Sequence, residues 1–123
     1  MTLEGQFGRR ALLEHEREIL REVLAHASFP GAAQLTRQVE HTSVDGGLPT
    51  LLDLTVATGA AAAADAVPDG PVACRALVHS PSGDVEGEII VWVKGGYLAG
   101  LEYAWFTDEA PVAIPPASRV RVQ

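Results

Sequence analysis

The sequence predicts an α+β fold, with one or two N-terminal helices packed on an antiparallel β-sheet of four to six strands. Two patterns lead to this prediction. Apolar residues recur at a helical period near the N-terminus, whereas in the rest of the chain they alternate or run together as in strands. With 123 residues the chain suits one domain, and we expect residues 1–123 to form it.

The first predicted helix covers residues 10–27, where leucine, isoleucine and valine recur with glutamate and arginine between them. The segment Phe29-Pro30-Gly31 ends it, because proline cannot continue the hydrogen-bond ladder. A short second helix is predicted over residues 32–39 from Leu35 and Val39 at four-residue spacing. A strand would also tolerate this run.

Four strands and an edge strand are predicted after the helices. The alternation of TLLDLTVA predicts a strand over residues 50–57, which an alanine-rich loop follows. Apolar runs predict the next strands, and a turn with Gly83 separates the first two of them. These strands cover residues 72–79, 85–94 and 97–106, and the edge strand covers residues 119–122.

Gly95-Gly96 predicts a two-residue hairpin turn, which gives a register that can be checked. With Lys94 opposite Tyr97, the pairs are Val93–Leu98, Trp92–Ala99, Ile90–Leu101 and Glu88–Tyr103. Both faces of this hairpin are apolar at the centre, so we expect it to be central in the sheet. The helices should cover one face. Loops and the C-terminal tail cover the other, or it stays partly open as a binding surface.

The composition excludes several classes of partner. Sixteen acidic and nine basic residues give a formal charge of −7 and a pI near 4.9, which disfavours binding to nucleic acid or to an anionic membrane. The one cysteine cannot form an intramolecular disulfide, and the charged N-terminus shows no signal peptide. We therefore expect a cytoplasmic protein. Eight arginines to one lysine indicate a GC-rich, bacterial genome.

No catalytic, cofactor-binding or metal-binding residue is predicted. Phosphate-binding glycine motifs and the G-x-S-x-G nucleophile motif are absent. The four histidines have no pairing at three- or four-residue spacing, and Cys74 suits a small core residue better than an activated thiolate. Glu86 and Glu88 share a strand face in the predicted register, but a solvated acidic strand end explains them.

The C-terminal half is both aromatic and acidic. Five of the seven aromatic residues lie between Trp92 and Phe106, among several carboxylates. Such a composition is common at protein interfaces. Core packing is favoured for Trp92, whereas core and interface both stay open for Tyr103 and Trp105. The predicted partner-binding residues are Glu86, Glu88, Glu102, Tyr103, Trp105, Asp108 and Glu109.

The segment GYLAGLEYAWFTDEAP, residues 96–111, resembles a G-Y-L-x-x-L-E-Y-x-x-x-T/D-D-E-x-P signature of small bacterial proteins of unassigned function. In those proteins a helical N-terminus with an F-P-G turn precedes a strand-rich half, and many carry clustered cysteines before a P-x-x-D-L-x-V strand. Here PTLLDLTV keeps the strand, but Val44-Asp45-Gly46-Gly47 replaces the cysteines. The resemblance therefore implies the fold and no metal or redox role. The chain is also similar to immunity proteins in size, charge and architecture alone.

Three functions follow as hypotheses. The first is a noncatalytic protein-binding module, such as an immunity-type inhibitor, that presents an acidic and aromatic surface to a basic protein partner. The second is a small enzyme or small-ligand-binding protein, with a helix–sheet pocket that gathers polar groups such as Glu102 and Tyr103. The third is a homodimer that pairs through the aromatic face.

Overall fold

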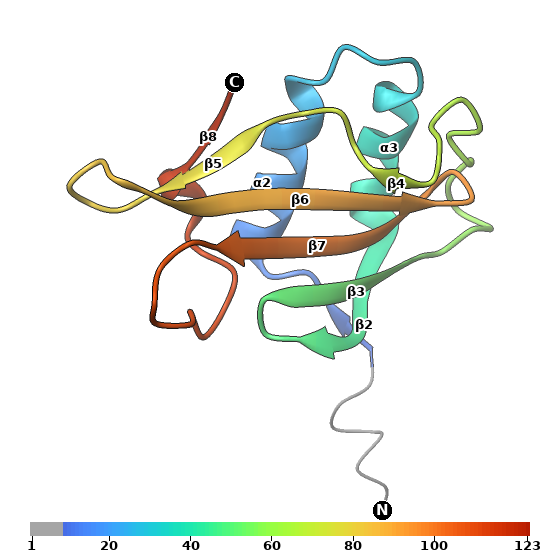
Figure 1. Ribbon diagram of the computed structural model, residues 1–123. Coiled ribbons are helices and arrows are strands. Elements are labelled where there is room, and N and C mark those ends of the chain that lie inside the picture. Colours follow the sequence, from blue (N-terminus) through green and yellow to red (C-terminus); the bar gives the residue numbers. More distant parts are fainter. Residues whose placement is uncertain (1–8) are drawn as a thin grey trace, which may run out of the picture.

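A computed structural model describes residues 9–123, and both of its α-helices lie on the same side of one antiparallel sheet (Figure 1). The expected N-terminus without a signal peptide falls largely on residues 1–8, outside the described residues. The helices are α2 (Glu14–Ala25) and α3 (Ala32–Gln38), with the 3-10 turns η1 (Val39–His41) and η2 (Ala117–Arg119). Within residues 9–123, no helix is long and apolar enough to cross a lipid bilayer.

The described part of the chain forms eight strands, in the order β1-β2-β3-β7-β6-β5-β8, with β4 paired to β6. The strands are β1 (Arg10–Ala11), β2 (Thr42–Leu48), β3 (Leu51–Val56), β4 (Gly70–Pro71), β5 (Ala76–His79), β6 (Val85–Lys94), β7 (Tyr97–Trp105) and β8 (Val120–Val122). The α+β class is confirmed, and the β6–β7 hairpin is central as expected. The sheet is larger than the four to six strands predicted.

The additional strands have weak sequence patterns. β1 and β4 have two residues each, too few for a period. β2 has the sequence TSVDGGL, whose two glycines resemble a turn. Its register against β3 shifts between Val44 and Gly47. Gly47 adopts a φ of +102°, and a Cβ there would collide with the carbonyl oxygen of Leu51, so this bulge requires glycine.

The predicted start of the first helix is wrong. Residues Arg10–Ala11 pair with β2, and α2 begins at Glu14. The Glu16 carboxylate fixes this boundary, because it accepts hydrogen bonds from the Leu13 N–H at 2.8 Å and from both terminal nitrogens of Arg10 at 2.9 and 3.0 Å. α2 ends at Ala25, before the Phe29-Pro30-Gly31 segment. The second segment is a helix, as predicted.

The strand predicted over residues 72–79 is shorter, since only Ala76–His79 form β5. The preceding residues turn instead: the Cys74 N–H donates to the Val72 carbonyl at 2.9 Å, and the Val72 N–H donates to Val91 at 2.9 Å. β6 has the predicted bounds, and β8 lies at the sheet edge as expected.

The predicted hairpin register holds only near its turn. Lys94 pairs with Tyr97 and Val93 with Leu98, but the next pair is Trp92 with Gly100. One residue is therefore extra in β7, and a one-residue slip exchanges the faces of all that follow. Ile89, not Glu88, lies opposite Tyr103, and Ile90 lies opposite Glu102.

The core fills the space between the sheet and the two helices. The bulge brings Leu98, Leu101 and Tyr103 to the same inner face, where they join the odd-numbered residues of β6. The helices cover this face with apolar side chains that are almost fully buried. These residues are Ile19, Leu20, Val23, Leu24 and Leu35.

Gln38, at the end of α3, is fully buried, and its side-chain amide makes three hydrogen bonds. Its Nε2 donates to the carbonyls of Ala62 and Gly96, both at 2.9 Å, and its Oε1 accepts from the Leu98 N–H at 3.0 Å. β3 pairs with β7 only from Gly100 to Glu102. The glutamine amide thus satisfies backbone groups at the part of β7 that β3 does not reach.

The substitution Gln38→Leu should lower the free energy of unfolding by about 2 kcal/mol or more, because it leaves the Leu98 N–H without its partner in a buried place. Urea unfolding measures the loss, and the exposed Gln34→Leu on the same helix is the matched control. Equal stability of the two variants would contradict this role of Gln38.

Glu16 should make the stability depend on pH. Burial by itself raises the pKa of this carboxyl. The hydrogen bonds from Arg10 and Leu13 and the charges of Arg10 and His15 lower the pKa by more than burial raises it, so it lies below its ordinary 4.5. A lowered pKa contributes stability that is present above pH 4.5 and is lost as the pH falls through the folded-state value.

We therefore expect Glu16→Gln to lower stability at neutral pH by about 1–3 kcal/mol and to flatten the loss of stability below pH 4.5. Urea titrations over an acid series measure both effects. Glu14→Gln, at an exposed site on the same turn of α2, should leave both nearly unchanged. If Glu16→Gln loses stability below pH 4.5 as steeply as the wild type does, the Glu16 carboxylate is not the group responsible for that loss.

Candidate functional site

Both helices described within residues 9–123 lie on one side of the sheet, and we call the other side of β3, β7, β6 and β5 the open face (Figure 1). The register places its side chains in three rows across the strands. The rows are Asp53–Gly100–Trp92, Leu51–Glu102–Ile90 and Ala104–Glu88–Leu77. Arg121 of β8 extends the last row. Glu102 therefore lies at the middle of the open face between two apolar side chains, and the face carries three carboxylates against one guanidinium group.

Trp92 is held in a defined position on the open face. Its Nε1 donates a hydrogen bond to Oε1 of Glu102 at 2.9 Å. Its ring lies over Gly100, where an added Cβ would stand 3.2 Å from the ring atom Cδ1. The absence of a side chain at Gly100 lets the Trp92 side chain pack closely against the strand, and the hydrogen bond to Glu102 fixes its orientation. Trp92 is half-buried.

The seven predicted partner-binding residues do not form one surface. Glu88 and Glu102 lie on the open face, whereas Glu86, Tyr103 and Glu109 line a pocket on another side of the hairpin. Trp105 is 40% exposed and Asp108 is exposed, and neither lines this pocket.

Two specific expectations are corrected here. Trp92 was favoured as a core residue, but it lies on the open face, while the buried aromatic residue is Tyr103, with 5% of its surface exposed.

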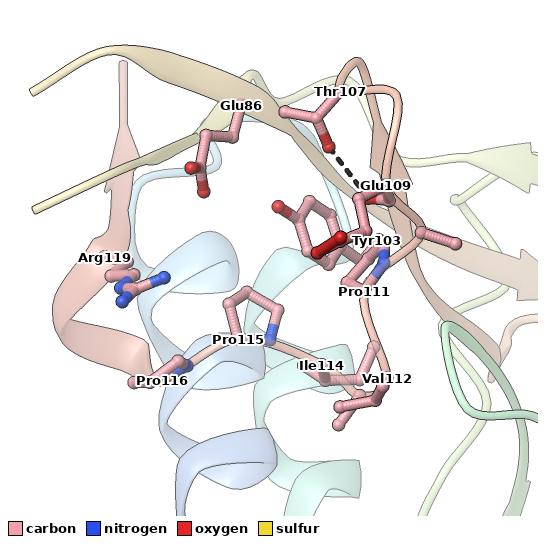
Figure 2. Close-up of a pocket in the computed structure, with 12 residues that line it drawn as sticks. Glu86, Tyr103, Thr107, Glu109, Pro111, Val112, Ile114, Pro115, Pro116 and Arg119 are labelled. Atoms are coloured by element: carbon pink, nitrogen blue, oxygen red, sulfur yellow. Dashed lines mark hydrogen bonds between the residues drawn. The ribbon is translucent and has the colours of Figure 1, made fainter.

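The second corrected expectation concerns Glu86 and Glu88, which do not share a face. β6 has an extra residue opposite β5 between Gly87 and Val85, and this bulge turns Glu86 toward Tyr103 (Figure 2).

Sequence reasoning also missed Asp53, Leu51 and Arg119. Gly100 inside an apolar strand was the available signal for the bulge in β7.

The pocket lies where β6 and β7 meet the C-terminal segment, and its volume is about 510 Å³ (Figure 2). Tyr103 comes from β7, Glu86 from β6 and Arg119 from η2, while the segment after β7 supplies Glu109. Residues 110–116 add an apolar wall, in which Ile114 and Pro115 are buried.

The Tyr103 hydroxyl points into this pocket, toward the side where Glu86 and Arg119 lie (Figure 2). Burial raises the pKa of Tyr103 above its ordinary value, the charge of Glu86 raises it further, and the charge of Arg119 opposes them. The hydroxyl therefore keeps its proton at neutral pH and can donate a hydrogen bond.

Other chemistry has little support. Burial raises the pKa of the Cys74 thiol, and its Sγ lies 3.5 Å from the Val23 carbonyl, which is the reverse of an activated thiolate. In the part of the chain that the structure describes, no group of three or more His, Cys, Asp or Glu side chains is placed to hold a metal ion. The anticipated pair of Glu102 and Tyr103 is divided between the two faces of β7.

Comparison with protein-family models, with curated proteins and with solved structures finds no significant match to this chain. The function is therefore argued from the two surfaces described above.

The ionisation of Tyr103 should report the charges of its pocket. In a Tyr97→Phe background, where Tyr103 is the remaining tyrosine, absorbance titration should give a pKa above 10. Glu86→Gln should lower this pKa, because it removes a repelling charge, and Arg119→Gln should raise it. Shifts of the opposite signs would show that these side chains do not face Tyr103.

Proposed function

We propose that this chain is a noncatalytic protein-binding module whose open face receives a basic protein partner. The observation that carries the proposal is the central sheet face that the described helices leave uncovered, on which Glu102 fixes the position of Trp92. Large aromatic side chains in rigid positions supply much of the binding free energy at protein interfaces. Trp92 and its neighbour Ile90 offer such an anchor, and no conformational search of the indole is needed on binding.

The charge of the molecule favours a basic partner. Asp53, Glu88 and Glu102 lie on the open face among apolar side chains, and the whole chain carries a formal charge of −7. A field of this sign accelerates encounter with a cationic surface and repels acidic ones. The immunity-type reading is the finer form of this proposal: the open face would cover a basic region of a toxin and block its access to substrate.

Two pairs of charge reversals test the proposal. Asp53→Lys with Glu88→Lys alters the open face, and Asp108→Lys with Glu109→Lys alters the exposed segment after β7. Both double variants change the net charge by the same amount, so each controls for the other. Tagged wild type and both variants are used to capture proteins from lysate of the native host at low and high salt, with quantitative mass spectrometry.

We expect one stoichiometric basic protein that elutes with salt, is retained by Asp108→Lys/Glu109→Lys and is lost with Asp53→Lys/Glu88→Lys. With the purified partner, the open-face pair should slow association at least tenfold at low salt. Equal losses for both pairs would indicate nonspecific charge attraction, and binding lost only with the second pair would place the interface at the segment after β7. Either outcome, capture of no protein, or light scattering that shows a dimer through this face would overturn the proposal.

A further inference from the structure

The pocket at the end of the β6–β7 hairpin carries an inference separate from the open face. Four polar groups from different parts of the chain converge there: the Tyr103 hydroxyl, the Glu86 and Glu109 carboxylates, and the Arg119 guanidinium (Figure 2). Convergence from separate elements is typical of a binding pocket and unlike a run of charges along one helix.

Tyr103 is the buried member of this group. Its side chain is only 5% exposed, yet its hydroxyl points into the pocket, and no hydrogen bond joins it to another residue drawn in Figure 2. Among residues 9–123 the buried side-chain atom without a hydrogen-bond partner is Nδ1 of His79, so the Tyr103 hydroxyl is accessible from the pocket and can donate to a ligand there. The Tyr103 ring packs closely against the backbone of Gly87, where an added Cβ would stand 2.7 Å from the ring atom Cε1. The donor therefore has a fixed direction into the pocket.

The charged groups of the pocket are not paired with one another. The ion pairs found among residues 9–123 lie along α2 and at β1 and β2, and none includes Glu86, Glu109 or Arg119. The hydrogen bond drawn between Thr107 and Glu109 ends on the backbone carbonyl of Glu109, so it leaves that carboxylate free (Figure 2). The pocket thus presents both signs of charge.

We propose that this pocket binds a small zwitterion, a molecule that joins an ammonium group and a carboxylate to an apolar body, as in a free apolar α-amino acid. Arg119 and the Tyr103 hydroxyl receive the carboxylate, and Glu86 and Glu109 receive the ammonium group. Val112, Ile114 and the neighbouring prolines contact the apolar body. A volume of about 510 Å³ holds a ligand of this size.

None of three simpler classes of ligand uses all four groups. An organic cation would leave Arg119 facing a like charge, and an organic anion would face two carboxylates. A neutral apolar molecule would desolvate three charged side chains without compensation. Only a ligand with both charges matches each wall of the pocket.

The test is a titration of the ¹⁵N-labelled full chain with each of the twenty standard amino acids, followed by NMR and calorimetry. We expect an apolar amino acid to shift the amide signals of residues 86, 103, 107–110, 112–114 and 119. If leucine is the hit, isopentylamine lacks its carboxylate and isocaproate lacks its ammonium group. Each should bind at least tenfold more weakly, since each loses a charged hydrogen-bond set.

The variants Tyr103→Phe, Arg119→Gln and Glu86→Gln should each weaken binding about tenfold or more, and the first and last keep nearly the size of the native side chain. Glu88→Gln is the matched control, because it lies two residues from Glu86 on the open face and should bind as the wild type does. If no amino acid shifts these signals, if the amine alone binds as tightly as the amino acid, or if Arg119→Gln has no effect, the proposal is wrong. Partner capture by the open face does not enter this experiment, so the two proposals succeed or fail separately.

Discussion

The side-chain amide of Gln38 is the contact on which the arrangement of the hairpin depends. It binds Gly96 of the hairpin turn and Leu98 of β7, and connects them to α3 and to the loop at Ala62. The extra residue of β7 follows directly after Leu98. A bulge is a weak point of a ladder, because one residue there has no cross-strand partner. Anchoring the strand beside the bulge fixes its position, and with it the face to which every later side chain of β7 points.

Two bulges together separate two surfaces within one hairpin. The bulge in β7 sends Tyr103 to the helix side and Glu102 to the open face, where Glu102 orients Trp92. The bulge in β6 opposite β5 turns Glu86 away from Glu88 and toward Tyr103. Without them, alternation would place both glutamates of β6 on the same face. The acidic residues that look like one cluster in the sequence therefore serve two different environments.

The sequence was informative where the pattern is local and long. The bounds of β6, the helix over Ala32–Gln38 and the central place of the hairpin follow from periodicity, turn glycines and apolarity on both faces. It was uninformative where a tertiary contact decides. The start of α2 depends on Glu16 meeting Arg10, a contact across the strand-to-helix junction, and the pairing of β2 depends on the backbone freedom of Gly47. Neither contact changes the apolar period that sequence reasoning uses.

The composition of the pocket was beyond sequence reasoning for a related reason. Arg119 lies sixteen positions after Tyr103, and no pattern connects the two. The connection is made by β8, which pairs with β5 and so brings η2 alongside the end of the sheet. Because β5 is the neighbour of β6, the same pairing places Arg119 beside Glu86. The guanidinium group of Arg119 thus lies in a cavity that the Tyr103 hydroxyl also lines, whereas the guanidinium group of the open face, Arg121, lies on the edge strand β8.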